Sequence, residues 1–142
     1  MINDQYAMII RKAAVEIGGS FTNLAFQVVD GSVSARSQLA QSRPTDTTAT
    51  SILAPSSGTT YGISTLIICN TTGSDATYRI FHDNDGTTYD ETTALFYDQT
   101  IRNNTTVGLD LALILKDGGN LAVRSGTGSA LTFTVYGITF IS

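Results

Sequence analysis

The stretch TVGLDLALILKDGGNLAVRS, residues 106–125, decides the fold class of this chain. Its first half has leucine at positions 109, 111, 113 and 115, with Asp110, Ala112 and Ile114 between them. Successive side chains of a β-strand point to opposite faces, so this period of two predicts a strand with one face in a core. KDGGN follows as a hairpin-type turn, because Asp and Gly favour tight turns, and NLAVRS resumes as the next strand.

The same succession of strands and turns extends in both directions from these residues. TTATSIL, YGISTLIICN, ATYRIFH, TALFYDQTI and ALTFTVYGITFIS read as strands, separated by APSSG, TTGSD, RNNT and GTGS. Short strands at this spacing, with no helical period between them, predict an all-β antiparallel β-sandwich, either jelly-roll or immunoglobulin-like. The composition agrees, because 42% of the residues are hydrophobic, 14% are charged, and thirteen glycines accompany only two prolines.

A chain of 142 residues is long enough for one core and short for two. We predict a sandwich domain over residues 47–142, preceded by an N-terminal arm over residues 1–46. Within the arm, Leu24–Val29 has the pattern of a strand, and the Ser-, Gln- and Arg-rich stretch after it reads as a linker.

The first residues of the arm allow two conformations. In NDQYAMIIRKAAVEIGG, alternation of apolar and polar residues around Ile9 and Ile10 favours an extended or mixed segment. A short helix capped by Asn3 or Asp4 and stopped by two glycines is the alternative.

The charge distribution excludes some classes of partner. A net charge of −4 and a pI near 4.6 argue against a nucleic-acid-binding surface, which needs a basic stripe. The charge is uneven, since residues 1–43 carry a net charge of +1 and the rest of the chain −5. We find no signal-peptide pattern and no apolar run long enough for a membrane span, and therefore expect a soluble protein made in a cytoplasm.

RIFHDNDGTTYDE, residues 79–91, holds the only histidine and a cluster of acids. An EF-hand calcium loop read back from Gly86 would place Phe81 where the first aspartate belongs, so that motif fails at its first ligand. An irregular cation site stays open, with three carboxylates as its ligands: Asp83, Asp85 and Asp90.

Catalysis in the same stretch is not favoured. One histidine, His82, and one cysteine, Cys69, cannot assemble a multi-histidine zinc site, and Cys69 reads as a small buried hydrophobe. Asp90 and Glu91 are adjacent, so on a strand they would point to opposite faces rather than converge on a glycosidic bond. We predict no enzyme activity, no cofactor and no metal, and interpret Asn84-Asp85-Gly86 as a hairpin turn with a solvated acidic tip.

Two of the predicted strands are apolar on both faces. YGISTLIICN places Ile67 and Cys69 on one face and Leu66 and Ile68 on the other, and the last strand ends with three large apolar residues. A two-layer sandwich buries one face of each strand, so the other should be covered by the arm or by another subunit. The predicted interface residues are Ile9, Ile10, Leu66, Ile68, Ile138 and Phe140.

Residues 50–140 resemble the small β-sandwich structural proteins of tailed bacteriophages. The resemblance rests on an apolar strand ending in CNTTG, the DGTTYD loop leading to ALFYD, and the LKDGGNLAVRSGTGS segment before a last Phe/Val/Gly strand. The chain departs from the family in having APSSGTT in place of the usual Pro-Ala-Gly turn, and its first 46 residues match nothing in it.

The resemblance implies a virion component, either a capsid decoration (cement) protein or a tail or fibre part. A decoration protein would form a homotrimer at a local threefold axis, bind the major capsid protein on the capsid exterior, and assemble in the host cytoplasm. A carbohydrate-binding module is the alternative from another class, because sandwiches of this kind often bind sugars. Its aromatic platform would be Tyr78, Tyr89 and Tyr97.

Overall fold

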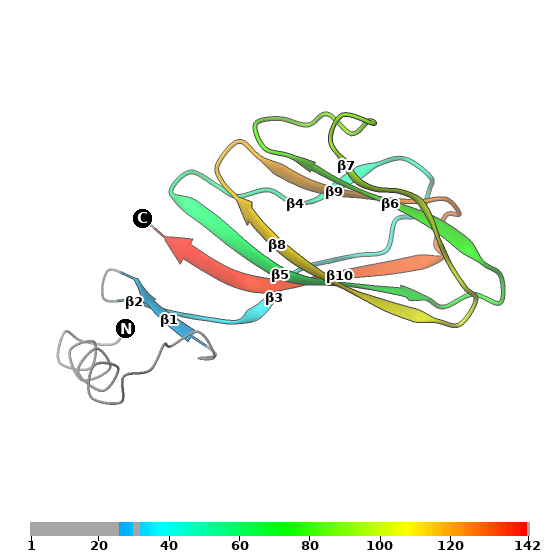
Figure 1. Ribbon diagram of the computed structural model, residues 1–142, viewed down its shortest axis with the longest axis horizontal. Coiled ribbons are helices and arrows are strands. Elements are labelled where there is room, and N and C mark those ends of the chain that lie inside the picture. Colours follow the sequence, from blue (N-terminus) through cyan, green and yellow to red (C-terminus); the bar gives the residue numbers. More distant parts are fainter. Residues whose placement is uncertain (1–25, 30–31, 142) are drawn as a thin grey trace.

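The computed structural model describes residues 26–29 and 32–141, and its regular structure there consists of β-strands (Figure 1). In chain order these are β1 (Phe26–Val29), β2 (Ser32–Ala35), β3 (Ser37–Ser42), β4 (Thr50–Leu53), β5 (Thr59–Asn70), β6 (Ala76–Asp83), β7 (Ala94–Ile101), β8 (Thr106–Leu115), β9 (Asn120–Ser125) and β10 (Leu131–Ile141). In these ranges no helix is long and apolar enough to cross a membrane.

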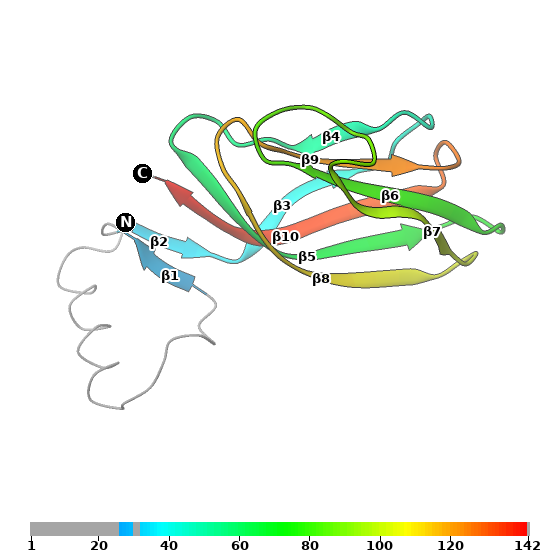
Figure 2. The ribbon, with the colours of Figure 1, turned by 45° about the horizontal axis from the view of Figure 1, so that its top comes forward.

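Two antiparallel four-stranded sheets face each other and form a sandwich (Figure 2). Sheet 1 has the order β3-β10-β5-β8, and sheet 2 has the order β4-β9-β6-β7. The predicted all-β antiparallel sandwich is therefore confirmed. From β3 onward the chain changes sheet at every connection except β6–β7, and this order is that of a jelly roll rather than of an immunoglobulin fold.

Two turns predicted from the sequence join strands that lie in different sheets. KDGGN does form a tight turn, in which the Gly119 amide donates to the Lys116 carbonyl at 2.9 Å and Gly118 has a φ of 86°. However, this turn joins β8 to β9 in the opposite sheet, and SGTGSA likewise joins β9 to β10. Neither connection is a hairpin, because turn residues specify a local bend and not the strand with which the next strand pairs.

The core lies between the sheets and follows the predicted alternation on β8 and β10. Leu131, Phe133 and Val135 of β10 are fully buried, and Leu115 of β8 is also fully buried. Facing residues from sheet 2 complete the core, among them Tyr78, Ile80, Ile101, Leu121 and Val123.

The orientation of β5 contradicts one expectation. Leu66 pairs with Val135 and Ile68 with Phe133, so both side chains point into the core and are 0% exposed. The expectation that Leu66 and Ile68 lie on an outer face and contact a partner is wrong, because alternation defines two faces without saying which one meets the other sheet. The outward residues of this strand include Cys69, which is partly exposed rather than buried.

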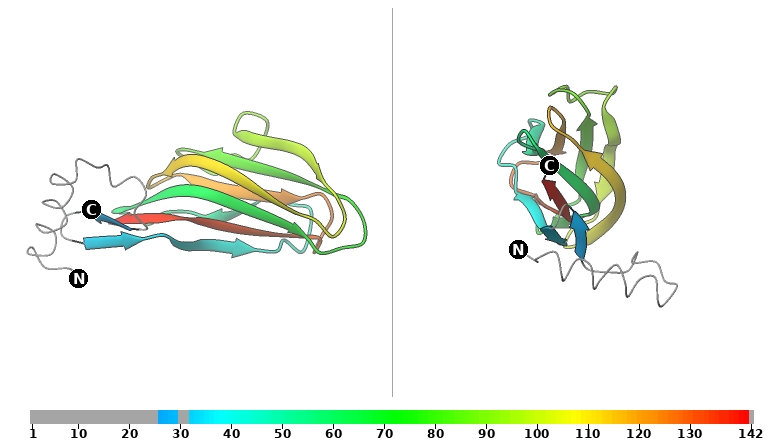
Figure 3. Two further views of the ribbon diagram at one scale, coloured as in Figure 1. Left: turned by 60° about the horizontal axis from the view of Figure 1, so that its bottom comes forward. Right: turned by 90° about the vertical axis from the view of Figure 1, so that its left-hand side faces the viewer.

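The sandwich also begins earlier than residue 47. Strand β3 pairs with β10 from Ser42↔Phe133 to Ser37↔Gly137, although its sequence SQLAQS was assigned to the arm. Its polarity reflects its place at the margin of sheet 1, where much of the strand is exposed. The β1–β2 hairpin lies at one end of the sandwich, beside the end of β10 (Figure 3). Ile9 and Ile10 lie outside the described residues.

Candidate functional site

The acidic loop between β6 and β7, residues 84–93, is a cap on the outer face of sheet 2. Asp83 at its start is 6% exposed, and its carboxylate accepts hydrogen bonds from the Thr88 amide at 2.6 Å and the Asp85 amide at 3.3 Å. The side-chain amide of Asn120, on β9, donates through Nδ2 to the backbone carbonyl of Gly86 at 2.9 Å and so holds the loop against β9. The bond from the Thr88 amide is the main reason why the pKa of Asp83 is lowered.

Below this loop lies Phe81, which is 1% exposed although it sits on the outer face of its sheet. The ring of Tyr89, from the loop, is 6.1 Å from the Phe81 ring, centroid to centroid. β6 and β7 do pair as an antiparallel hairpin, but residues 84–93 join them as a long loop and not as a tight turn at Asn84-Asp85-Gly86. Among the described residues, positive φ angles occur at Asp98, Asn104, Ser129, Gly58 and Gly118, and not at Asn84, Asp85 or Gly86.

Asp90 of the loop is hydrogen-bonded within the loop. Asp90 accepts from the Thr92 amide at 2.8 Å and from the Thr92 hydroxyl at 2.6 Å, and these bonds lower its pKa. In the described part of the chain no three His, Cys, Asp or Glu residues are grouped to hold a metal ion. His82 is partly buried, and its Nε2 atom has no hydrogen-bond partner among the described residues. The hydrogen bonds to the Asp83 and Asp90 carboxylates therefore stabilise the conformation of the loop.

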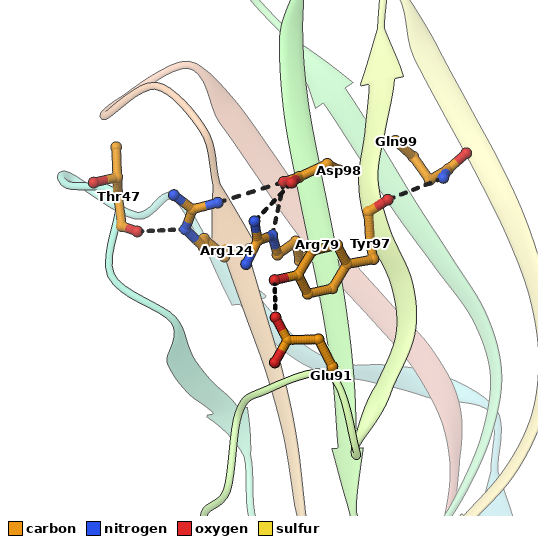
Figure 4. Close-up of polar contacts among 7 residues, drawn as sticks. All are labelled: Thr47, Arg79, Glu91, Tyr97, Asp98, Gln99 and Arg124. Atoms are coloured by element: carbon orange, nitrogen blue, oxygen red, sulfur yellow. Dashed lines mark hydrogen bonds and ion pairs between the residues drawn. The ribbon is translucent and has the colours of Figure 1, made fainter.

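A second polar cluster lies on the outer face of sheet 2, around Arg79 (Figure 4). The pairs Tyr78↔Gln99 and Ile80↔Phe96 leave two residues of β7, Tyr97 and Asp98, opposite Arg79. This two-against-one arrangement is a β-bulge. Both bulge residues bind the arginine. Its guanidinium carbon lies 3.6 Å from the centroid of the Tyr97 ring, and its Nε and Nη2 donate to Asp98 at 2.7 and 2.6 Å.

Neighbouring side chains complete the Arg79 cluster. Arg124 forms an ion pair with Asp98, with 3.5 Å between Nη1 and Oδ1, and its Nε donates to the Thr47 carbonyl at 2.7 Å. The Tyr97 hydroxyl donates to Oε1 of Glu91 at 2.6 Å. The hydrogen bonds from Arg79 hold the pKa of Asp98 below its ordinary value. The bulge and these charges protect the edge of sheet 2 at β7 against pairing with another strand.

The three tyrosines considered as a sugar platform do not form one. Tyr78 is 5% exposed and faces the core, Tyr89 packs against Phe81, and Arg79 covers the ring of Tyr97. The expectation of a platform is wrong, because strand spacing alone did not show that Tyr78 and Tyr97 face opposite sides of the sheet.

The other long edge, β8 of sheet 1, lies at the margin of its sheet (Figure 2) and carries a bulge but, within the described residues, no ion pair. It has ten residues, no proline, and Asp110 as its one charged residue. The core-facing leucines 109, 111 and 113 stay only partly buried, because no strand of residues 26–29 and 32–141 continues the sheet beyond β8. Natural edges normally carry Lys, Pro or inward charges. One bulge, at Leu111–Ala112, interrupts its pairing with β5.

The outer face of sheet 1 carries an apolar hollow. Ile138 pairs with Gly62, and Gly62 pairs with Ile114, so these residues form a row across three strands on the face away from the core. Ile114 is 50% exposed. Arg36 stands at the end of the row, since it precedes Ser37, the partner of Gly137. The hollow holds about 330 Å³ and is lined by Arg36, Gly62, Ile63, Ser64, Leu111, Ala112, Leu113, Ile114, Gly137 and Ile138.

A crease in sheet 1 shapes this hollow. The three pairings of the sheet all shift register along one line, at Val135/Tyr136, at Tyr136/Gly137 and at Ile63/Thr65. Gly137 is required there, because a Cβ atom would overlap the carbonyl oxygen of Gly62. Of the lining residues, the sequence predicted only Ile138 as an interface residue. The period of two in β8 predicts that Ile114 points outward. The local sequence gives no sign that Ile114 lies near Arg36 or Gly62.

Phe140 lies on the same outer face of β10 as Ile138. The Cβ atom that Gly62 lacks would lie 3.1 Å from Ile138 Cγ1 and 3.3 Å from Phe140 Cε2. The two side chains therefore close over Gly62, whose other cross-strand neighbour is Ile114. Their contact with a partner stays a prediction.

No family model and no curated protein matches this chain. Solved structures with weak similarity to this chain include two viral proteins. The coat protein dimer of tobacco streak virus is 15% identical over 82% of this chain and 89% of its own, with a TM-score of 0.39. A pentameric capsid protein from metagenomic phage sequences is 18% identical over 99% of this chain and 91% of its own, with a TM-score of 0.33.

Proposed function

We propose that this chain is a structural protein of a bacteriophage virion, a capsid decoration protein that acts by protein–protein contacts. The observation that carries the proposal is the unprotected apolar edge of β8, with leucines 109, 111 and 113 half covered. Residues 50–140 supply the second support through their resemblance to small phage virion proteins, and jelly rolls are common in capsid proteins, although a fold alone does not fix function.

The proposed mechanism is burial of this edge against another copy and against the major capsid protein. Each square ångström of apolar surface removed from water contributes about 25 cal/mol, and stable interfaces bury roughly 1,600 Å² in total. An open strand adds unpaired backbone groups that a neighbour satisfies. We propose a homotrimer on the capsid exterior, assembled in the host cytoplasm, with no catalytic role. The absence of a catalytic role is supported by Asp83 and Asp90, whose carboxylates accept hydrogen bonds from residues of their own loop.

The test is a lysine placed on the open edge, Gly108→Lys. Gly108 is exposed, and a Cβ atom there would meet nothing within 4 Å, so the fold should tolerate the substitution. A matched control is Gly73→Lys, which has equally open surroundings but lies in the β5–β6 turn. Multi-angle light scattering of the wild-type protein should give about three times the 15.1 kDa of one chain.

Gly108→Lys should lower that mass and the occupancy on purified capsids, while Gly73→Lys should change neither. A wild-type protein that stays monomeric and leaves capsids undecorated would refute the proposal. Copy number separates head from tail: a decoration protein is present in numbers comparable to the capsid subunits, and a tail or fibre part in far fewer.

A further inference from the structure

The two margins of sheet 1, β3 and β8, have the properties of two halves of one contact. They lie at opposite ends of the strand order β3-β10-β5-β8, and among the described residues no further strand pairs with either of them (Figure 2). On the core side each margin carries apolar residues that are only partly buried, namely Leu39 and Ala40 on β3 and leucines 109, 111 and 113 on β8. A strand added at either margin would bury this apolar surface and satisfy backbone groups.

The directions of β3 and β8 fit a contact between copies that are related by rotation. Every neighbouring pair in sheet 1 is antiparallel, so these two strands, three steps apart, run in opposite directions. A rotation axis parallel to the strands leaves their directions unchanged, and β3 of one copy is then antiparallel to β8 of the next. A head-to-tail contact of this kind forms a ring when the rotation closes.

The register of such a contact follows from the pairings within sheet 1. Rotation about an axis parallel to the strands does not move residues along the strand direction. Each residue of β8 therefore meets, on the next copy, the β3 residue that ends its own row across the sheet. The rows that reach both margins join Val107 with Ser42, Gly108 with Gln41, Leu109 with Ala40 and Asp110 with Gln38.

The residues that this register brings together are chemically compatible. On the core side Leu109 meets Ala40, and the two partly buried residues cover each other. On the outer face Asp110, the one charged residue of β8, meets Gln38, whose side-chain amide is a hydrogen-bond donor. Arg36 is exposed and lies two residues from Gln38 on the same face, within diagonal reach of the Asp110 carboxylate.

The centre of the contact leaves room for a neighbouring backbone. Gly108 is exposed, and a Cβ atom there would meet nothing within 4 Å. Glycine inside a strand often marks a position that another backbone approaches closely. The crease of sheet 1 also reaches both margins, at Leu39 of β3 and at Leu111–Ala112 of β8, so the irregular part of one margin lies close to the level of the irregular part of the other.

We propose that β8 of one copy pairs in antiparallel with β3 of the next copy, so that sheet 1 continues from copy to copy around a ring. This inference rests on the proposed self-association through β8 and adds the surface that β8 contacts. A twofold contact of β8 with β8 would leave the partly buried Leu39 and Ala40 uncovered. The margins of sheet 2 fit less well, because β4 has four residues and β7 is bulged and bound by Arg79.

Disulfide cross-linking between β8 and β3 tests this pairing. All variants carry Cys69→Ser, since Cys69 is partly exposed. Gly108→Cys combined with Gln41→Cys places two thiols on the outer face, in one row and at exposed positions. Within one chain these positions are separated by three strand spacings, about 14 Å, whereas a disulfide needs Cα atoms within about 7 Å, so the bond forms only between copies. After oxidation the intact mass should be about three times the 15.1 kDa of one chain, and reduction should restore one chain.

A matched control and a second pair accompany this variant. Gly73→Cys with Gln41→Cys is the control, because Gly73 has equally open surroundings but lies in the β5–β6 turn; its mass should remain that of one chain. Asp110→Cys with Gln38→Cys occupies the next outer-face row, also at exposed positions, and should give the same covalent ring if the first pair disturbs folding. Circular dichroism of each variant shows whether the sandwich is folded.

Two results would overturn this pairing and leave the proposed virion role in place. One is an oligomer in which neither cysteine pair cross-links more than the Gly73 control. The other is a covalent dimer formed by Gly108→Cys without the Gln41 substitution, because that bond requires β8 to face β8. A covalent ring of another size would support the pairing and correct the proposed trimer. A protein that is monomeric in solution and absent from capsids would overturn the virion role and this pairing together.

Discussion

Three glycines of sheet 1 allow the same substitution to be made in three different steric environments. Gly137 of β10 lies in the crease, Gly62 of β5 lies under two side chains, and Gly108 of β8 faces open space. We expect Gly137→Ala to destabilise the protein strongly, Gly62→Ala weakly, and Gly108→Ala not at all.

The magnitudes follow from what each new Cβ atom would meet. At Gly137 it overlaps the carbonyl oxygen of Gly62 and comes within 2.9 Å of Leu39 Cδ1, so the backbone of two paired strands must separate. Overpacking of this kind costs about 3 kcal/mol, and a chain of this size loses roughly 3–4 °C of Tm per kcal/mol, which gives a decrease of about 10 °C.

At the other two positions the surroundings can yield. The atoms nearest to a Cβ on Gly62 are Ile138 Cγ1 at 3.1 Å and Phe140 Cε2 at 3.3 Å, which are ends of partly exposed side chains, so a cost below about 1 kcal/mol is expected. At Gly108 nothing lies within 4 Å, and reduced entropy of the unfolded chain should stabilise the protein by about 0.5 kcal/mol.

Thermal unfolding followed by circular dichroism measures all three variants under one condition. From the lowest Tm to the highest, the expected order is Gly137→Ala, Gly62→Ala, wild type and Gly108→Ala. A Gly137→Ala protein that melts with the wild type would show that the two backbones are not in close contact, and the crease would then not define the hollow. Equal losses in Gly137→Ala and Gly108→Ala would refute the steric argument altogether.

Three further predictions concern the core, the acidic loop and the bulge. Leu66→Asp should abolish cooperative unfolding rather than release folded subunits, because an unpaired carboxylate in the core costs several kcal/mol; circular dichroism distinguishes the two outcomes, and a folded monomer would contradict the burial of Leu66. Since the folded-state pKa of Asp83 lies below its ordinary value of 3.8, its contribution to stability is present above that pH and is lost as the pH falls below it. The protection factors of the amides at residues 84–93, which are corrected for the intrinsic pH dependence of hydrogen exchange, should therefore decrease in acid. In an Asp83→Asn variant these protection factors should be low already at neutral pH and lose this dependence. Because Asp98 has a φ of 47°, Asp98→Gly should melt at a higher temperature than Asp98→Ala, and equal melting temperatures would argue against the left-handed conformation.

Local alternation was enough to predict strands β4 to β10 and the core face of β8 and β10. Leucines at every second position of β8 and the Leu131, Phe133, Val135 series of β10 all face the core as predicted. In these strands one face is clearly more polar or smaller, so the pattern itself distinguishes inside from outside. In β5 both faces are apolar, and only its pairing with β10 decides that Leu66 points inward.

Non-local pairing limited what the sequence could tell about topology. β3 joins sheet 1 through β10, which lies about ninety residues further along the chain, and a polar hexapeptide gives no sign of such a partner. For the same reason Arg36, Gly62, Ile114 and Ile138 could not be recognised as one surface. Each belongs to a different strand or connection, and their proximity depends on three pairings and on the shared shift in register.

A comparison of the four sheet edges bears on how copies of this protein associate. β4 has only four residues, β7 is bulged and bound by Arg79, and β3 is polar, whereas β8 is long and apolar. A single open edge within sheets 1 and 2 allows two kinds of closed assembly through that edge. If two β8 strands pair about a twofold axis, both edges are consumed and the product is a dimer. A trimer requires each β8 to contact a different surface of its neighbour. The mass in solution therefore also identifies the contact: a dimer indicates β8 against β8, and a trimer indicates a second, complementary surface on the same chain.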